Sequence, residues 1–133
     1  MRVLETAIYT TKLEETARFY DKVLGLERIV SVPDRHVFFR MEGGVLLIFN
    51  PENTILPSKN ARMPVPSHGT VGQGHVCFAA SAEEIEGWIR HLEDHLVEIE
   101  ADFQWPGGGR SIYFRDPAGN SIEFAEPRIW GID

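Results

Sequence analysis

The sequence predicts an α+β fold made of two βαβββ modules that form a curved mixed sheet around a concave site. Each half of the chain reads as one strand, one amphipathic helix and three further strands. The halves also match each other at fixed offsets. The patterns Thr11-x-x-Glu14 and Ser81-x-x-Glu84 lie 70 residues apart, and the Phe-Arg, Gly and Phe positions of residues 39–49 recur 75 residues later. The alternative is an α+β domain whose internal similarity is accidental.

The first half opens with an alternating, strand-like run at residues 2–10. Thr11 and Glu14 then form a capping-box pattern, in which the hydroxyl caps the helix and the carboxylate reaches back. Apolar residues follow at helical spacing as far as Gly25, which is typical of a left-handed helix end. Three strand-like runs complete the module, at residues 26–32, 36–41 and 45–50.

The second half repeats this order. A strand is predicted at residues 75–80, a helix begins at the capping box of Ser81 and Glu84, and further strands are predicted at 96–101, 110–115 and 121–125. The whole chain, residues 1–133, is expected to form one domain, with a first module at 1–50, a linker at 51–73 and a second module at 74–126. The linker is long for a compact domain, which also suggests a lid, from which His68 could reach a site.

The composition argues against several classes of protein. The net charge of −7 offers no basic field for phosphates, so nucleic acid is not an expected partner. The single cysteine, Cys77, cannot form an internal disulfide. No apolar run approaches the ~18 residues of a membrane-spanning helix, and the first residues lack a signal-peptide apolar region. We therefore expect a cytoplasmic protein with no membrane partner.

Three polar residues occupy places where a strand would point them into the concave site. His75 begins the first strand of the second half, and Glu5 occupies the matching place in the first half. Glu123 lies between Ile122 and Phe124, so it projects to the opposite face if those two pack under the helices. A carboxylate there needs a partner, because burying an unpaired charge is costly, and a divalent cation would supply one. The alternative is an exposed histidine and a glutamate on a solvent face.

One imidazole and two carboxylates suit a divalent metal, Zn, Ni, Mn, Fe or Co, with positions left open for substrate oxygens. Such a metal acts as a Lewis acid. The ligand set predicted from Glu5, His75 and Glu123 is therefore that of a metalloenzyme.

The same residues carry a family resemblance. The segments LETAIYTTKLEETARFYDKVLGLE and GHVCFAASAEEIEGWIRHLEDH, with the stretch F-x-D-P-x-G-x-x-x-E ending at Glu123, resemble the vicinal-oxygen-chelate superfamily of glyoxalases, bleomycin-resistance proteins and dioxygenases. The resemblance implies metal ligands at Glu5, His75 and Glu123. A fourth ligand would fall at Ile48, or at Leu47 if the register shifts by one residue. Neither side chain can bind a metal, which argues against a standard glyoxalase I site.

Further site residues surround this set. The resemblance implies a substrate contact for Tyr113, which together with Glu123 forms the predicted catalytic pair. Arg110, in a glycine-rich hairpin, is predicted to meet an anionic substrate, and Trp105 and Phe103 to form an apolar wall. No cationic residues match those that hold phosphonate in fosfomycin-resistance relatives, so fosfomycin is not the expected substrate. The alternative for Tyr113 is a half-buried strand residue.

Two functions remain open. One is a metal-dependent enzyme acting on a small substrate chelated through two oxygens, by isomerisation, lyase chemistry, thiol transfer or dioxygenation. The other is a metal-free small-molecule binding protein, like the drug-sequestering members of the superfamily, which the apolar fourth position and Glu5 in place of the usual His both favour. The resemblance also implies a homodimer.

Overall fold

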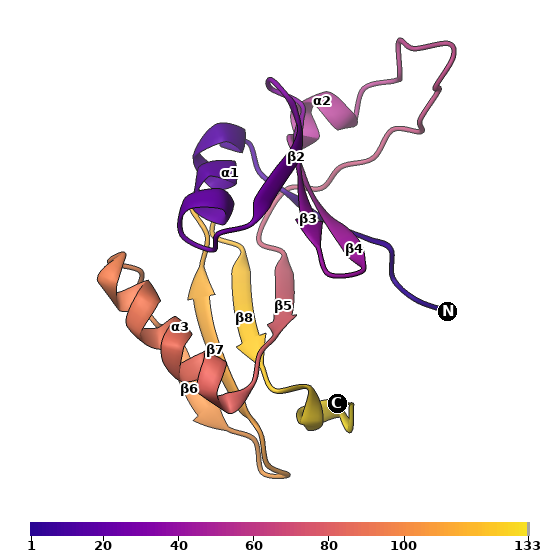
Figure 1. The fold of residues 1–133 in the computed structure, drawn as a ribbon. Helices are drawn as coiled ribbons and strands as arrows, with labels where there is room; N and C mark the ends of the chain where they lie inside the picture. Colours follow the sequence, from indigo (N-terminus) through magenta and orange to yellow (C-terminus); the bar gives the residue numbers. More distant parts are fainter. Residues whose placement is uncertain (133) are drawn as a thin grey trace. The chain divides into compact units, whose positions relative to one another are not determined.

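The computed structural model describes residues 1–132, which divide into two compact units, Met1–Gly72 and the residues from Gln73 onward. The first unit contains the following elements in order: β1 (Glu5–Tyr9), α1 (Leu13–Lys22), β2 (Glu27–Val32), β3 (His36–Met41), β4 (Gly44–Phe49) and the short α2 (Pro51–Thr54). Its four strands form one mixed sheet in the order β1-β4-β3-β2, in which only β1 and β4 run parallel (Figure 1).

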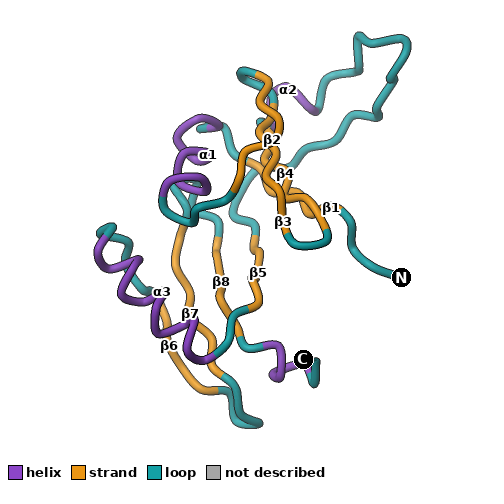
Figure 2. Tube along the Cα trace, in the orientation of Figure 1, coloured by secondary structure: helices purple, strands orange, loops and turns teal. Residues whose placement is uncertain are grey.

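The second unit repeats this topology. Its elements are β5 (His75–Ala79), α3 (Ala82–Asp94), β6 (Ala101–Gln104), β7 (Arg110–Arg115), β8 (Ser121–Ala125) and the 3₁₀ helix η1 (Pro127–Trp130). The sheet order is β5-β8-β7-β6, again with a parallel pair formed by the first and last strands (Figure 2). Two βαβββ modules with the same strand order confirm the predicted fold class. No helix within residues 1–132 is long and apolar enough to cross a membrane.

The helices α1 and α3 each cover one face of the sheet in their own unit. In the second unit the buried residues Ile112, Phe114, Ile122 and Phe124 lie on the side of α3, where the Trp88 ring stacks on Phe124 with centroids 4.5 Å apart. In the first unit Tyr20 of α1 is fully buried against Phe39 of β3, with centroids 6.0 Å apart. Burying each such side chain stabilises the fold by roughly 1.5–3 kcal/mol. The opposite face of each sheet is turned away from α1 in the first unit and from α3 in the second.

The two helices begin differently, although their sequences look alike. Ser81 accepts a hydrogen bond from the Glu84 amide at 3.1 Å and Glu84 accepts one from the Ser81 amide at 2.7 Å, so the second capping box is confirmed. The first is wrong: α1 has Lys12 at its N-cap and no side-chain cap. The hydroxyl of Thr10, rather than that of Thr11, accepts from the Lys12 amide, and Thr10 also bonds Thr16 inside the unit.

The strand predicted at residues 96–101 lies instead at Ala101–Gln104. Leu96 has a φ of 58°, a left-handed conformation that an extended strand excludes, and its side chain is exposed. The chain therefore turns at this residue before β6 begins.

Strand pairing shows which residues of the two units are equivalent. Glu5 pairs with Val45 across β1 and β4 as His75 pairs with Ser121 across β5 and β8, and two residues further on Leu47 takes the position of Glu123. The connection between the paired residues Arg115 and Ser121 spans residues 116–120, one residue longer than residues 41–44, which connect the equivalent pair Arg40 and Val45. The offset of 75 therefore holds for β3 and β7 but becomes 76 for β4 and β8.

This longer turn corrects part of the predicted repeat. Phe49 is equivalent to Ala125, and Phe124 is equivalent to Ile48. The position matching Glu123 is Leu47 and not Ile48, which is fully buried on the helix side.

Candidate functional site

The candidate site lies on the face of the β5-β8-β7-β6 sheet that is turned away from α3. His75 projects from β5, Tyr113 from β7 and Glu123 from β8, and strand pairing places all three on one face. Because Ile122 and Phe124 pack on the side of α3, Glu123 must point the other way, as the alternation in the sequence indicates.

The turn between β7 and β8 holds the beginning of β5 in place. Asp116 Oδ1 accepts from the amides of Ala118 and Asn120, and the buried Asn120 side chain donates to Asp116 Oδ2 at 2.9 Å. Asn120 Oδ1 in turn accepts from the Gly74 amide at 2.7 Å. The Asp-Pro-x-Gly-Asn turn therefore fixes the residue before His75 against the residue before β8. This is a structural reason for the F-x-D-P-x-G-x-x-x-E pattern.

His75 and Glu123 meet through atoms that are both able to accept a proton. His75 Nδ1 lies 3.0 Å from the Ser121 carbonyl oxygen, which can only accept, so Nδ1 carries a proton. His75 Nε2 lies 3.2 Å from Glu123 Oε2. If neither group held a proton on the facing atoms, two lone pairs would face each other across this gap. A proton held by one of the two groups, or a cation, must therefore lie between them.

The surroundings of Glu123 are donors rather than cationic side chains. The Glu123 side chain is 8% exposed, while that of His75 is 50% exposed. Burial, together with the nearby Glu123 carboxylate, raises the pKa of Tyr113 to about 12 against the opposing effect of Ser111. Tyr113 therefore keeps its proton at neutral pH.

The β6–β7 hairpin holds the neighbour of Tyr113 on the same face of the sheet. Trp105 Nε1 donates to Ser111 Oγ at 2.8 Å, and Ser111 is fully buried two residues before Tyr113 on β7. The Ser111 side chain is close enough to oppose the rise in the pKa of Tyr113. The indole donor therefore fixes the Ser111 hydroxyl near that of Tyr113.

Aromatic rings line the same face in a row from β5 to the β6–β7 hairpin. The Tyr113 ring stacks between His75, with centroids 6.2 Å apart, and Phe103, with centroids 5.9 Å apart. Trp105 meets Phe103 edge to face at 4.8 Å. Phe103 and Trp105 remain 39% and 37% exposed, which leaves them available to an apolar, planar ligand.

Two residues that lie next to the candidate site were not predicted from the sequence. Cys77 lies two residues after His75 on β5 and pairs with Glu123, and Ser111 lies two residues before Tyr113. The period of two along a strand could have identified both. Burial, together with the adjacent Glu123, raises the pKa of the Cys77 thiol to about 12, so the thiol is not a ready nucleophile.

Arg110 lies elsewhere. It is three residues from Tyr113 on β7, so it points to the opposite face, toward α3. There its guanidinium bonds Asp102 through Nε at 2.8 Å and through Nη2, and Nη1 bonds Glu86 of α3. Because its donors are already paired with carboxylates, we leave Arg110 out of the site proposed below.

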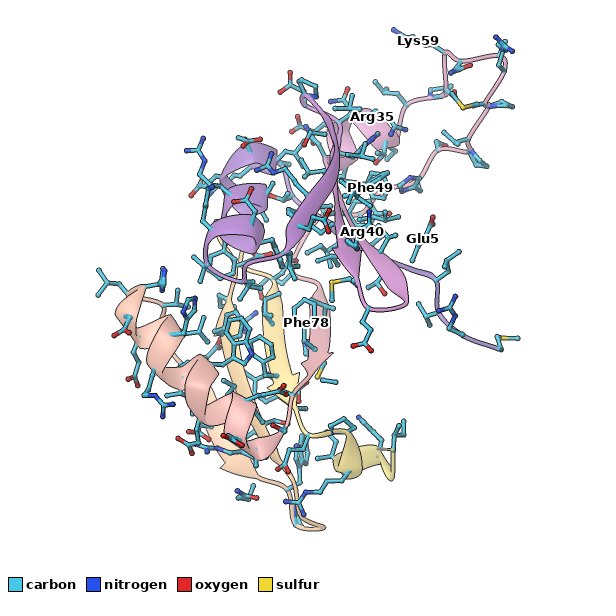
Figure 3. The ribbon with its side chains drawn as sticks, in the orientation of Figure 1. Glu5, Arg35, Arg40, Phe49, Lys59 and Phe78 are labelled. Carbon is cyan, nitrogen blue, oxygen red and sulfur yellow. The ribbon has the colours of Figure 1, made fainter. Side chains whose placement is uncertain are left out.

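The equivalent face of the first unit has a different character. Glu5 is exposed on β1 (Figure 3), and Leu47 stands where the second unit has Glu123. The face is aromatic near the other end of these strands: Tyr9 Oη bonds His68 Nδ1 at 2.7 Å, and the Phe49 ring lies 4.6 Å from that of His68. Within residues 1–132, no group of three or more His, Cys, Asp and Glu side chains is arranged to hold a metal ion.

The distance between the two donors of the second unit nevertheless fits a metal. Typical metal–nitrogen and metal–oxygen bonds of about 2.0–2.2 Å, at angles between a right angle and a tetrahedral angle, separate two ligand atoms by about 3.0–3.4 Å. The 3.2 Å between His75 Nε2 and Glu123 Oε2 falls in this range. The Nδ1 bond to Ser121 also orients the ring as the outer hydrogen bonds of metal-binding histidines do.

The sequence matches the Glyoxalase/Bleomycin resistance protein/Dioxygenase superfamily over residues 2–124, and the chain belongs to this family. Its fold is very similar to that of a lactoylglutathione lyase from Agrobacterium tumefaciens, with a TM-score of 0.91, 38% identity and coverage of 99% of this chain and 98% of that one. Proteins of the superfamily generally act on small molecules and use divalent metals.

Two more distant relatives agree with this fold. The virulence protein STM3117 of Salmonella typhimurium is 26% identical over 129 residues, which cover 94% of this chain and 83% of the relative. The fosfomycin resistance protein FosX of Listeria monocytogenes has a TM-score of 0.67 at 20% identity, with coverage of 95% of this chain and 93% of that one. At this identity the likeness to FosX concerns the fold alone.

Proposed function

We propose that the chain is a metal-dependent enzyme that acts on a small substrate chelated through two oxygens. The observation that carries this proposal is the facing pair His75 Nε2 and Glu123 Oε2, whose 3.2 Å separation suits one shared cation. His75 and Glu123 are the proposed ligands from the second unit. Glu5 is the proposed third ligand, because its strand pairing makes it the equivalent of His75.

The proposed reaction class follows from the donor set and from the relatives. One imidazole and two carboxylates suit Zn, Ni, Mn, Fe or Co. When bound, such a metal polarises substrate oxygens as a Lewis acid. Isomerase, lyase, thiol-transferase and dioxygenase chemistry are all compatible with that role, and the 38% identity to a lactoylglutathione lyase favours a lyase. We also propose a cytoplasmic location and a homodimer.

The chain's own residues would prepare this site in three ways. Tyr113 keeps its proton at Oη, because burial and the nearby Glu123 carboxylate raise its pKa, and it offers that proton as a hydrogen-bond donor beside Glu123. Phe103 and Trp105 offer an apolar wall that excludes water from one side of the substrate. Tyr113 and Glu123 are the proposed catalytic pair, because both have polar atoms at the place where substrate oxygens would bind.

Metal content and metal affinity test the proposal directly. Tag-free protein supplied with each of the five metals is expected to retain one of them after gel filtration, as measured by elemental analysis and by calorimetry. His75→Ala and Glu123→Gln are expected to lose that metal, since each removes one of two adjacent donors. His91→Ala is the matched control, because His91 lies on α3. Wild-type metal content in both site variants would show that the proposal is wrong.

A metal-free binding protein is the second candidate, and the aromatic row from His75 to Trp105 favours it. Such a protein would bind planar aromatic compounds against Phe103 and Trp105 with the same affinity in the presence and absence of a chelator. Quenching of Trp105 fluorescence measures this binding, with Trp105→Phe as the control. Ligand binding that disappears when the metal is removed would favour the enzyme.

A further inference from the structure

Residues 55–67, here called the arm, leave the first unit after α2 and return to it at His68. The two ends of the arm are closed by a hydrogen bond from the His68 amide to the Thr54 carbonyl oxygen at 3.0 Å. The His68 ring is fixed next to this point by its bond to Tyr9 and its contact with Phe49. The arm is therefore a loop that is anchored at both ends, and it extends beyond α2 (Figure 1).

Every residue of the arm is exposed, including its four large apolar side chains. Ile55, Leu56, Met63 and Val65 are 60%, 55%, 65% and 51% exposed. Hydrophobic residues exposed singly are common, but four within thirteen residues give the arm an apolar surface large enough to favour burial against a partner.

The arm has a defined shape although the rest of its unit does not cover it. Asn60 Oδ1 accepts hydrogen bonds from the amides of Arg62 and Met63 at 3.0 and 3.1 Å, which sets a turn at the tip. Pro57, Pro64 and Pro66 restrict the backbone on both sides of that turn. A segment already restricted in this way loses less conformational entropy when it docks.

The charge of the arm is opposite to that of the remaining chain. The arm carries Lys59 and Arg62 and no acidic residue, so it contributes +2, and the rest of the chain contributes −9 to give the total of −7. Lys59 lies on the outer part of the arm, away from the strands of its unit (Figure 3). A basic, apolar arm on an acidic protein is complementary to the body of another molecule of the same kind.

We propose that the arm docks on the acidic body of a second copy of this chain. The proposal rests on the homodimer suggested above and assigns the surface that forms it, independently of whether a metal is bound. Contact with a second copy would bury the exposed apolar side chains and place Lys59 and Arg62 next to carboxylates. Attraction of this kind weakens with ionic strength, because salt screens exposed charges.

Sedimentation velocity and light scattering of the full-length chain test this surface. The wild-type chain is expected to be a dimer whose dissociation constant rises with salt concentration. Lys59→Glu with Arg62→Glu, and separately Met63→Ser with Val65→Ser, are each expected to weaken the dimer at least tenfold, about 1.4 kcal/mol. Lys12→Glu with Arg90→Glu makes the same change of net charge at exposed residues outside the arm, and is expected to leave the dimer near wild-type strength.

Thermal melting checks that all variants remain folded, which is expected because the arm bonds the rest of its unit only at its ends. A monomeric wild-type chain would overturn the proposal. Arm variants that dimerise as strongly as the wild type would also overturn it, and this result is expected if the arm packs on its own chain. Metal content measured on the same samples separates the two proposals. A metal-free dimer that is weakened by the arm substitutions would contradict the proposed metalloenzyme and support the proposed dimer surface.

Discussion

Burial and a neighbouring positive charge both favour the neutral form of His36. Burial lowers the pKa of His36, and the positive charge of Arg35 lowers it further. Arg35 Nη1 lies 2.7 Å from His36 Nδ1, so that nitrogen accepts a hydrogen bond and carries no proton. The ring also stacks on Phe38 with centroids 4.2 Å apart. A second proton on this imidazole would therefore be unfavourable in the folded protein.

This lowered pKa predicts a loss of stability in mild acid. The unfolded chain, with an ordinary histidine pKa of about 6.5, binds the proton before the folded chain does. Stability is then fully present above about pH 6.5 and falls as the pH drops toward the lowered pKa, by at most about 1.4 kcal/mol per pH unit for one group. Urea unfolding of wild type and His36→Asn at several pH values measures the effect, which is expected to be smaller in the variant.

His95→Gln serves as the control, since His95 is exposed just beyond α3 and contacts its own helix. An identical pH dependence in wild type and His36→Asn would contradict this account of His36.

The site residues that the sequence could predict are those placed by the alternation of side chains between the two faces of a strand. The placement of Glu123 opposite to Ile122 and Phe124 followed from alternation alone. The same rule shows that Arg110 and Tyr113, three residues apart, must point to opposite faces. The partners of Arg110 could not be predicted, because Asp102 and Glu86 come from β6 and α3, which only the fold brings to it. The link from Trp105 through Ser111 depends on the hairpin in the same way.

At the scale of elements, the unequal helix starts lead to a prediction. Ser81→Ala removes an oxygen that accepts from the Glu84 amide, and is expected to cost about 1 kcal/mol of the free energy of unfolding. Thr11→Ala is expected to change it by less than about 0.5 kcal/mol, because no hydroxyl of Thr11 caps α1. Denaturant unfolding of both variants measures the difference. Equal losses would show that the two helix starts are alike after all.

The elements that the sequence predicted well have patterns that local physics alone determines. The β3, β7 and β8 strands begin and end where expected, since each is a short run containing apolar and aromatic residues with turn residues close to its ends. Thr10 and Thr11 are both able to cap a helix, and what decides between them is Thr16, one turn inside α1 and bonded to Thr10. The position of β6 depends on the left-handed conformation of Leu96, which no pattern in the sequence indicates.

At the scale of the whole molecule, the internal duplication has preserved the backbone of the two modules and changed their chemistry. Both sheets have the same strand order and the same parallel pair. At the three positions that form the candidate site, the second unit has His75, Tyr113 and Glu123, and the first has Glu5, Phe38 and Leu47. The sequence showed the duplication but could not fix the last equivalence, because one extra residue in the turn at 116–120 shifts it.

This equivalence can be tested by transferring the pair. Leu47→Glu places an unpaired carboxylate at a site that is 8% exposed, two residues along the strand register from Glu5, and is expected to cost about 3–5 kcal/mol of unfolding free energy. Adding Glu5→His supplies an imidazole at the position equivalent to His75, which faces Glu123 in the second unit. The double variant is expected to recover about 1.5–3 kcal/mol, the value of a hydrogen bond to a charged group.

Glu5→His alone is the control, because Glu5 is exposed. A double-mutant cycle from urea unfolding gives the coupling. Simple addition of the two single effects would mean that positions 5 and 47 do not face each other as His75 and Glu123 do.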